Sequence, residues 1–368
     1  MPDVFEYIDL ESVVGTNILS HRTESKSSAP SRAQRLAQKG DVFYQTVRPY
    51  QKNNCIFEKN DNNWVFSTGY AQLRPVNDSY FLLTLLQNED FVKLVLDRCT
   101  GTSYPAINSN DLADIDVNVP SDSKEQQQIG TYFKQLDHLI TLHQRKCEQT
   151  KKLKKYMLQK MFPQNGAKVP EIRFDGFTYD WEQRKLGATN TFFTDGNYGE
   201  AYPKSSDMTD SGSGVPFLTG GNLKDGKLSL DGASYITPEK HSKLTSGHLL
   251  EDDIVIAVRG SLGALGYVNT DNSGWNINSQ LAILRTDKSE LYGKFLIQYL
   301  LSWTGQNELL KRQTGSALKQ LPIGAIKDVE VPITSIAEQE KIGEYFDSVD
   351  HLITLHQRQH KLHLNMHL

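Results

Sequence analysis

A nearly complete phosphate-binding motif lies at residues 221–227, with the sequence GNLKDGK. In a P-loop of the form G-x-x-x-x-G-K, the next residue is a Ser or Thr that binds magnesium, and the following helix directs its N-terminus at the phosphates. Here Leu228 stands at the hydroxyl position, and the run LSLDGASYIT alternates in polarity as a strand does. We therefore interpret residues 221–227 as a hairpin loop rather than as a nucleotide site.

A second pattern with chemical potential is Pro2-Asp3 followed by Glu24-Ser25-Lys26, which satisfies a loose nuclease motif of acidic metal ligands plus a lysine. Such ligands need rigid positioning at strand ends. The polar run HRTESKSSAPS around Glu24 predicts a loop instead, so we interpret the match as accidental. The sequence also lacks the Asn/Asp-Pro-Pro-aromatic tetrapeptide of adenine-methylating enzymes. We expect no catalytic activity from this chain.

Histidines are concentrated at the C-terminus, where five of the ten lie in the last 18 residues. His356, His360, His363 and His367 have helical spacing, and paired histidines at i and i+4 can bind a transition metal. Because no cysteine or carboxylate joins them, we favour a partly solvated helix end without metal. The basic run KKLKKYMLQK at 151–160 leaves two interpretations open, contacts to phosphates or a solvated helix face.

Bulk composition limits the class of protein. The 368 residues suffice for about two domains, and the net charge of −4 means that any contact with a polyanion must use local basic patches. The three cysteines, Cys55, Cys99 and Cys147, have no metal-ligand spacing and indicate a reducing compartment. The N-terminal MPDVFEYIDL is not a secretory signal, and apolar runs such as IVIAV are too short to span a membrane. We expect a cytoplasmic protein without membrane association.

The most informative feature is an internal repeat. The segment DHLITLHQR occurs at 137–145 and again at 350–358. The match extends to EQQQIGTYFKQLDHLITLHQRK at 125–146 and EQEKIGEYFDSVDHLITLHQRQ at 338–359, with 15 identities in 22 positions. Weaker matches precede it in the same order, among them VRPY with VRGS, AQLR with AILR, RCTGTS with RQTGSA, and DVNVP with DVEVP. The order and the near-constant offset predict two copies of one domain, each ending in a helix.

The repeated segments predict long helices with an apolar seam. Apolar residues recur at alternating steps of three and four, which is typical of a coiled coil. The seam residues are Ile129, Phe133, Leu136 and Ile140 in the first copy and Ile342, Phe346, Val349 and Ile353 in the second. The first helix is expected to run for about 37 residues, or roughly 55 Å at 1.5 Å per residue. We expect the two helices to pair with each other as an antiparallel coiled coil.

The remaining sequence predicts α+β domains with a strand-rich surface. Short apolar runs such as DVFYQTV, DDIVIAVRG and SQLAILRT are broken by Gly, Asn, Asp and Pro, as expected for strands. The run at 295–313, FLIQYLLSWTGQNELLKRQ, predicts one helix. We expect a first domain at 1–124, a central spacer helix at 125–163, a second domain at 164–335 with a linker to about residue 170, and a C-terminal spacer helix at 336–368.

These motifs resemble those of the specificity subunits of Type I restriction–modification systems. The resemblance rests on the paired EQxxIGxYFxxxDxLITLHQR helices, on QKMFP at 159–163, and on EIRFDGFTYDWEQRKLG at 171–187, which is similar to the family's lead-in to a recognition domain. The loops GDVFYQTVRP at 40–49 and DDIVIAVRGSLG at 252–263 are similar as well. The resemblance covers essentially the whole chain.

The resemblance implies two tandem target-recognition domains that each read one half of a bipartite double-stranded DNA sequence, with the helices as a ruler. It implies a non-catalytic subunit to which two methyltransferase (modification) subunits and restriction (translocase–nuclease) subunits bind. S-adenosylmethionine, ATP and magnesium would then be held by those partners and not by this chain. A tandem scaffold that binds proteins or glycans is the alternative, which the acidic net charge mildly favours and the helix and lead-in motifs disfavour.

Base edges are read by polar and charged side chains on loops that a stable scaffold positions. The candidates for DNA contact are Arg48, Tyr50, Lys52, Arg98, Ser103, Tyr104, Thr219, Asn222, Arg259, Ser261, Asn276, Asn278, Gln280, Arg312, Ser316, Lys319 and Gln320. Each is equally compatible with a solvated loop residue, except that Arg98 and Arg312, which precede the TG turns in both copies, are expected to position phosphates or to be structural. Sequence readout is expected where the two copies differ.

The first copy departs from the second at its front. Aligned on the repeat, the first domain lacks roughly 40 residues, including any counterpart of DGFTYDWEQRKLG. We expect a first domain that is truncated or rearranged; a fragment of a longer parent, or completion by another chain, would explain the difference equally well.

Overall fold

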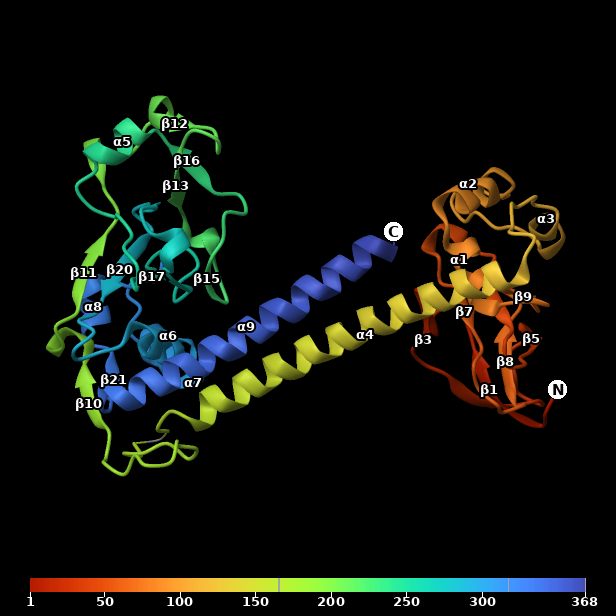
Figure 1. Ribbon diagram of the computed structural model, residues 1–368, viewed down its shortest axis with the longest axis horizontal. Helices are drawn as coiled ribbons and strands as arrows, with labels where there is room; N and C mark the ends of the chain where they lie inside the picture. Colours follow the sequence, from red (N-terminus) through yellow and green to blue (C-terminus); the bar gives the residue numbers. More distant parts are fainter. Residues whose placement is uncertain (165, 317, 368) are drawn as a thin grey trace. The chain divides into compact units, whose positions relative to one another are not determined.

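The structure is a computed structural model that describes residues 1–164, 166–316 and 318–367, with only the backbone of His367 described. Leu368, the last residue of the expected C-terminal helix, lies outside the described residues. The chain forms two compact units, Met1–His143 together with the chain from Gln359 onward, and Gln144–Arg358. Both combine strands with helices, which confirms the α+β class (Figure 1).

The first unit contains two small sheets and a hairpin. The four-stranded sheet, in the order β4-β1-β8-β5, consists of β1 (Val4–Ile8), β4 (Arg22–Ser25), β5 (Ala33–Leu36) and β8 (Trp64–Ser67). The three-stranded sheet, in the order β7-β6-β9, consists of β6 (Val42–Gln45), β7 (Cys55–Ile56) and β9 (Tyr70–Leu73). The hairpin is β2 (Val13–Val14) with β3 (Asn17–Ile18), and the short helices are α1 (Ser79–Gln87), α2 (Glu89–Asp97) and α3 (Ser109–Ala113).

The second unit has the larger sheets. The six-stranded sheet, in the order β11-β20-β17-β18-β15-β14, consists of β11 (Phe192–Asp195), β14 (Leu223–Lys224), β15 (Gly226–Leu228), β17 (Ile254–Ala257), β18 (Leu265–Tyr267) and β20 (Leu281–Arg285). The four-stranded sheet, in the order β12-β16-β13-β19, consists of β12 (Met208–Thr209), β13 (Val215–Leu218), β16 (Ser234–Ile236) and β19 (Asn276–Ile277). A separate pair joins β10 (Glu182–Lys185) to β21 (Glu330–Ile333). The short helices are α5 (Pro238–Lys243), α6 (Gly293–Leu301), α7 (Trp303–Leu310) and α8 (Ile323–Lys327).

The repeat seen in the sequence is also a repeat of strand pairing. β6 pairs antiparallel with β7 and β9, just as β17 pairs antiparallel with β18 and β20. β1 pairs antiparallel with β4 and parallel with β8, and β13 repeats this pattern with β16 and β19. The two units are therefore two copies of one fold, each with its own apolar core.

A buried ion pair recurs at the same place in both copies. Asp41 precedes β6 and accepts hydrogen bonds from Arg74 Nε at 2.7 Å and Nη2 at 2.9 Å. Asp253 precedes β17 and accepts equivalent bonds from Arg285, both at 2.7 Å. Both carboxylates are buried, and a buried charge is tolerated when paired in this bidentate geometry. The pair ties the residue just before the central strand to the end of the neighbouring strand.

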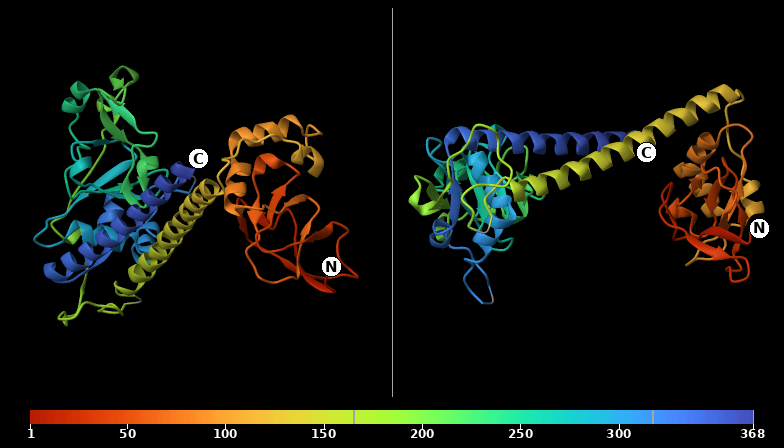
Figure 2. Two further views of the ribbon diagram at one scale, coloured as in Figure 1. Left: turned by 45° about the vertical axis from the view of Figure 1, so that its right-hand side comes forward. Right: turned by 90° about the horizontal axis from the view of Figure 1, so that it is seen from below.

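The long helices are α4 (Ser123–Lys160) and α9 (Ile336–His367), which confirms the helices expected from the repeat. In the second unit, the C-terminal part of α4 and most of α9 lie side by side (Figures 1 and 2), and Lys154 Nζ lies 2.7 Å from Asp350 Oδ1. In the first unit, His360 Nδ1 lies 3.2 Å from the Ile140 carbonyl oxygen. Residue 140 of α4 thus meets residue 360 of α9, and residue 154 meets residue 350, so the two helices run in opposite directions.

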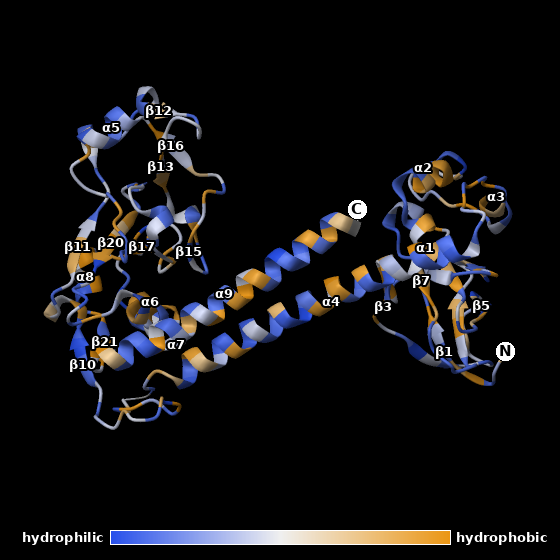
Figure 3. Ribbon diagram, in the orientation of Figure 1, coloured by the Kyte–Doolittle hydropathy of each residue, from blue (hydrophilic) through white to orange (hydrophobic). Residues whose placement is uncertain are grey.

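The eight seam residues are all buried or half-buried, whereas many polar positions between them are exposed. Along both helices, hydrophobic and hydrophilic turns alternate (Figure 3). This distribution is the one expected for a helix that buries a narrow apolar stripe.

A glycine in each repeated helix has a packing role. In the repeated IGxYF segment, a Cβ atom on Gly130 would lie 2.0 Å from Asp78 Oδ1 and 2.8 Å from the Phe81 amide nitrogen. Asp78 is the N-cap of α1 and accepts a hydrogen bond from the Phe81 N–H at 2.7 Å. Gly343, the equivalent residue of α9, meets the N-terminal residues of α6 in the same way, with Lys294 Cβ 3.0 Å from the added atom. At these glycines α4 therefore crosses the start of α1 at close range, and α9 crosses the start of α6 in the same way.

Two expectations from the sequence were wrong in detail. The single helix expected at 295–313 is two helices, α6 and α7, which meet at Ser302, where Ser302 Oγ accepts from the Gly305 N–H at 3.1 Å and starts a new helix. Glu24 lies in strand β4 rather than in a loop, paired with Phe5 of β1, and its carboxylate accepts from Arg22 Nε at 2.8 Å.

The P-loop-like segment is the expected hairpin. β14 and β15 pair antiparallel, with Leu223 opposite Leu228 and Lys224 opposite Lys227. The two turn residues, Asp225 and Gly226, both have positive φ, as in the two-residue turns that connect hairpins. The described residues that follow it, 229–236, form a loop and strand β16, and no helix N-terminus is present among them to hold a phosphate.

The irregular segments contain 3-10 turns at Pro49–Gln51, Leu186–Ala188, Gly199–Ala201, Ser205–Asp207, Gly220–Asn222 and Thr270–Asn272. Within the described part of the chain, no helix is long and apolar enough to cross a membrane.

Candidate nucleic-acid interface

An arginine follows the central strand in both copies and starts the candidate interface. Arg48 comes shortly after β6 and Arg259 shortly after β17, at equivalent positions of the repeat. In each unit an isolated bridge joins this region to a tight loop that follows two short helices, α1 and α2 in the first unit and α6 and α7 in the second. The bridges are Val47 to Ala106 and Arg259 to Gln320. The same topology therefore brings together the same two loops in both copies.

In the first unit the arginine stacks on a tyrosine. The Arg48 guanidinium carbon lies 4.3 Å from the centre of the Tyr104 ring, and the Arg48 N–H donates to the Pro105 carbonyl at 2.7 Å. Tyr104 is 64% exposed, and Tyr50 and Ser103 are exposed on the same loops. Arg48 is half-buried. A cation held in this way on an exposed aromatic face is suited to a phosphate oxygen or a base edge.

The backbone around this arginine is unusual. Arg48 and Lys52 both have φ of 54°, on either side of the 3-10 turn Pro49–Gln51. The left-handed conformation costs a non-glycine residue about 1 to 2 kcal/mol, and such residues are concentrated at functional sites. Lys52 is less available than expected, because its Nζ lies 2.6 Å from the Glu89 carboxylate.

In the second unit Arg259 is held by three groups. Its Nε donates to Gln320 Oε1 at 3.2 Å, its Nη1 donates to the Ser279 carbonyl at 3.3 Å, and its guanidinium carbon lies 5.4 Å from the Tyr198 ring centre. Gln280, which was expected at the interface, accepts a backbone bond from the Arg259 N–H. The structure thus brings together Arg259, Gln280 and Gln320 from three separate loops.

Tyr198 is a member of this cluster that the sequence did not reveal. Its hydroxyl donates to the Ser279 carbonyl at 3.1 Å. Burial and the nearby Asp195 raise the pKa of Tyr198 despite the opposing effect of Arg259, so the phenol is a donor at neutral pH. It lies in the segment DGNYGE, where an aromatic residue between Gly196 and Gly199 is a sequence signal for a loop site.

The other candidates of the second unit fall into two groups. Ser261, Ser316 and Lys319 are exposed and lie on the loops that meet at Arg259 or beside them. A Cβ atom on Gly220, the residue after Thr219, would lie 3.7 Å from Ser261 Cβ, which places the 219–222 turn next to the Arg259 loop.

Three candidate asparagines are buried, and two of them, Asn222 and Asn278, hold loops together through side-chain hydrogen bonds. Asn222 Oδ1 accepts from the Thr219 N–H at 2.9 Å and its Nδ2 donates to the Ser229 carbonyl at 3.0 Å. Asn278 Oδ1 accepts from the Gln280 N–H at 3.0 Å, and Asn276 is fully buried. As direct base contacts these three residues are disfavoured, because a buried side chain cannot reach a base edge.

The tight loops that follow Arg98 and Arg312 have the same backbone geometry in both copies. Gly101 and Gly315 have φ of 86° and 90°, and an added Cβ would lie 3.0 Å and 2.5 Å from the carbonyl oxygens of Tyr104 and Leu318. Only glycine fits such a turn without strain. The TG dipeptide shared by both copies therefore has a structural cause.

Of the two arginines before these turns, Arg312 is clearly engaged in the fold. Its Nη1 donates to the Glu308 carboxylate at 2.6 Å and its Nη2 to the Asp328 carbonyl at 2.7 Å. Burial raises the pKa of Glu308, but the bonds from Lys311 and Arg312 outweigh it and hold that pKa below its ordinary value. Arg98 is exposed, with one longer bond of 3.4 Å to the Asp111 carbonyl. The structural role fits Arg312, and a phosphate contact remains a prediction for Arg98.

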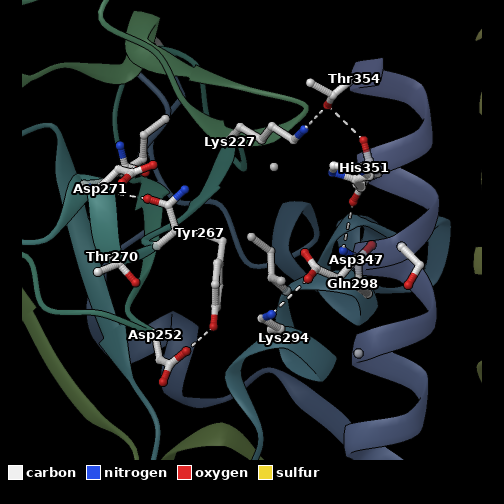
Figure 4. Close-up of a pocket in the computed structure, with 18 of the residues that line it drawn as sticks. Lys227, Asp252, Tyr267, Thr270, Asp271, Lys294, Gln298, Asp347, His351 and Thr354 are labelled. Atoms are coloured by element: carbon white, nitrogen blue, oxygen red, sulfur yellow. Dashed lines mark hydrogen bonds and ion pairs between the residues drawn. The ribbon is translucent and has the colours of Figure 1, made fainter. Parts of the chain in front are cut away.

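A cavity of about 1000 Å³ lies between the β18 side of the second unit and α9 (Figure 4). Several of its charged groups have partners: Lys294 Nζ lies 3.0 Å from Asp347, Lys227 Nζ donates to Thr354 Oγ1 at 2.6 Å, and Asp252 accepts from the Tyr267 hydroxyl. The first two contacts join α6 and β15 to α9, so this cavity lies where the domain is fastened to the long helix.

The C-terminal histidines lie along the helix pair. The rings of His143 and His363 are 5.3 Å apart, while the side chain of His367 lies outside the described residues. Among the residues whose positions are described, no group of three or more His, Cys, Asp or Glu side chains is placed to hold a metal ion.

Two tandem α+β domains of one fold, each with an arginine-centred loop cluster and each joined to a long paired helix, define a class of two-domain recognition proteins. Residues 6–152 and 179–365 match the family model described as the Type I restriction modification DNA specificity domain. The chain belongs to this family and is of the specificity-subunit type, with two target-recognition domains.

Individual relatives agree with this assignment. A Methanocaldococcus jannaschii protein described as the MjaX type I restriction enzyme specificity subunit is 26% identical over 333 residues, 87% of this chain and 74% of that protein. The MjaVIII specificity subunit of the same organism is 24% identical over 293 residues, 77% of this chain and 66% of that protein. This chain therefore spans about two thirds to three quarters of the length of these relatives.

Solved structures share the fold. The S subunit of a Type I restriction–modification system from M. genitalium superposes with a TM-score of 0.60 at 16% identity, covering 99% of this chain and 86% of that chain. A chain from a type I R-M system, solved to explain complex assembly and conformational transition, gives a TM-score of 0.53 at 23% identity, covering 98% and 88%. The comparisons do not favour the protein- or glycan-binding scaffold.

Proposed function

We propose that this chain reads a bipartite double-stranded DNA target, one half with each domain, as the non-catalytic subunit of a Type I restriction–modification complex. The observation that carries the proposal is the recurrence of one loop cluster in two copies. Arg48 and Arg259 occupy equivalent positions, each beside a tyrosine, while the residues around them differ. Equivalent arginines suit the uniform phosphate backbone, and differing neighbours suit two unrelated half-sites.

The helices supply the spacing. The 38 residues of α4 are about 57 Å long at 1.5 Å per residue, and major-groove sites on one face of DNA recur about every 34 Å. A rigid spacer of this length is on the scale needed to separate two half-sites by a gap that is not read.

The partners follow from the family. Two modification subunits would bind this chain and methylate adenine with S-adenosylmethionine, and restriction subunits would use ATP and magnesium to cleave unmodified DNA. This chain would hold none of these cofactors and would act in the cytoplasm.

The proposal is tested by measuring affinity for duplex DNA against salt, in the presence of a modification subunit. Replacing a phosphate contact lowers affinity and reduces the slope of log affinity against log salt by about 1. We expect this from Arg48→Ala and Arg259→Ala, and no change from Lys168→Ala, which removes an exposed charge from the linker. The proposed interface is contradicted if the affinity for DNA does not depend on salt. It is also contradicted if Arg48→Ala, Arg259→Ala and Lys168→Ala all have the same affinity.

A further inference from the structure

One surface is exposed in the first unit, whereas the equivalent surface of the second unit is buried. We call it the open face and define it as the outer edge of β9 together with residues 117–133. In the second unit the equivalent surface is covered by residues of the chain's own lead-in segment, 171–187, and by β11. The two copies thus provide an internal comparison of the same surface, covered and uncovered.

The valines of the repeated DVxVP motif show the difference most directly. Val329 and Val331 of the second copy are fully buried, whereas Val117 and Val119 of the first are 43% and 51% exposed. In the second unit this motif forms β21, paired antiparallel with β10. In the first unit residues 115–120 form no strand. Two exposed valines in a segment that pairs with no described strand indicate a missing strand partner.

In the second unit, two apolar residues on either side of β10 cover the valines of the DVxVP motif. Trp181 and Leu186 are buried in the same core cluster as Val329 and Val331. The Leu186 N–H donates to the Val329 carbonyl at 2.9 Å. β10 therefore satisfies the backbone of this motif while its flanking side chains bury the valines.

A charge shows the same contrast. Glu338, near the start of α9, is fully buried and accepts two hydrogen bonds from Arg173 of the lead-in segment, at 2.7 and 2.8 Å. Glu125, the equivalent residue of α4, is exposed. Among the described residues, an arginine pairs with the glutamate of the EQ dipeptide in the second copy and not in the first.

The seam residues that follow repeat the pattern. Ile342 and Phe346 are buried, and Phe346 stacks on Phe162 with ring centres 6.2 Å apart. Ile129 and Phe133, their counterparts in α4, are only half-buried.

The sheet edge completes the open face. β20 lies between β17 and β11, whereas β9, its counterpart, is the edge strand of its sheet and, among the described strands, pairs only with β6 (Figure 1). The arginine at the end of each strand reflects this. The Arg285 side chain, near the Phe192 ring of β11, is 33% exposed, and the Arg74 side chain is 56% exposed.

We propose that the open face binds a separate polypeptide that carries a lead-in sequence like residues 171–195 of this chain. Such a segment would place an arginine on Glu125, a Trp and a Leu over Val117 and Val119, and strands beside the DVNVP segment and β9. Adding strands to an exposed edge gives affinity through main-chain hydrogen bonds and specificity through the side-chain pockets.

A second copy of this chain is not the expected partner. Its own Trp181 is buried and its Arg173 is paired with Glu338, so its lead-in segment is already in use. The inference concerns the first unit by itself and does not rest on the proposed reading of DNA.

The test uses the full chain and a synthetic peptide of residues 167–195 as the probe. We expect saturable binding by fluorescence anisotropy, with hydrogen-exchange protection appearing at 70–74 and 117–121 and none lost at 329–333. Val117→Asp with Val119→Asp should weaken binding at least tenfold. Val14→Asp, which changes an equally exposed valine of the same unit, should leave it unchanged.

The peptide itself supplies the second control. Peptides with Trp181→Ala or Arg173→Ala should each bind at least tenfold more weakly. To the Glu125→Gln protein, the unchanged peptide and the Arg173→Ala peptide should bind equally, because the carboxylate that the arginine pairs with is gone. The proposal is overturned by absent binding, by protection outside 70–74 and 117–121, or by protection that arises without peptide from concentration-dependent self-association.

Discussion

Lys154 Nζ of α4 lies 2.7 Å from both carboxylate oxygens of Asp350 of α9. The two side chains are only 12% and 19% exposed, and they come from residues 196 positions apart. Asp350 is the first residue of the second copy of DHLITLHQR, and Asp137 is the first residue of the first copy. The repeated segment therefore holds a polar contact of the helix pair as well as its apolar seam.

Removing one member of this pair should destabilise the second unit. Lys154→Ala leaves a largely buried carboxylate without its cation, which costs about 1 to 3 kcal/mol. Lys151→Ala removes a more exposed lysine whose Nζ lies 3.6 Å from Glu148, and should change stability by less than about 0.5 kcal/mol. Denaturant unfolding followed by circular dichroism distinguishes the two, and equal midpoints would show that the pair contributes nothing.

Gly130→Ala should destabilise the first unit although alanine favours a helix. The methyl group would lie 2.0 Å from Asp78 Oδ1, so either the cap of α1 or the crossing of α4 must shift. We expect a loss of about 1 to 3 kcal/mol, the usual cost of overpacking. The matched control is Gly324→Ala in α8, where nothing lies within 4 Å of the added atom and a gain of up to about 1 kcal/mol is expected. Thermal unfolding of both variants gives the comparison.

The buried ion pair of the first copy makes stability depend on pH. Burial raises the pKa of Asp41, but hydrogen bonds from Arg74, Gln72 and the Gln38 N–H outweigh it and hold the pKa below its ordinary value. A carboxyl whose pKa falls on folding contributes stability above its unfolded pKa of about 3.9 and loses it as the pH falls through the folded value. Wild-type stability should therefore decline below about pH 4.

Asp41→Asn should remove that contribution. At pH 7 the variant should be less stable by about 1 to 3 kcal/mol, because the Arg74 guanidinium loses its bidentate acceptor. The difference from wild type should shrink in acid, as measured by urea unfolding from pH 7 down to pH 3. Asp61→Asn, an exposed change in the same unit, should follow the wild-type curve. A difference that stays constant with pH would exclude the ion pair as its cause.

Lengthening the helices should lengthen the gap in the DNA target. Three heptads, or 21 residues, inserted after Lys146 in α4 and after His356 in α9 add about 32 Å, close to one turn of DNA. We expect the methylated motif to gain about 9 to 10 base pairs of unread gap with both half-sites unchanged. A motif with its original gap would mean that the helices are not the ruler.

Much of the fold could be predicted from the sequence because the repeat and the local periodicities are strong. The seam predicted α4 and α9, and the short apolar runs predicted β6, β17 and β20. The break at Ser302 was missed because the apolar pattern continues across it, and a serine cap is a weak signal inside such a run.

The candidate site was predicted only in part, because it depends on contacts between distant loops. Arg259 and Gln320 were found as separate loop residues, but their meeting with Tyr198 requires the fold. Asn276 was expected at the interface on its residue type, and the structure buries it. Burial of this kind cannot be read locally, since the motif DVxVP is buried in one copy and exposed in the other.

The most direct measurement is a genome-wide map of methylated adenine made by this chain with a Type I modification subunit. We expect methylation within a bipartite motif of two unrelated halves, and Arg259→Ala should weaken methylation at that motif without lowering the amount of complex. Methylation without a sequence motif, or none from an assembled complex, would contradict the claim that this chain specifies a DNA target.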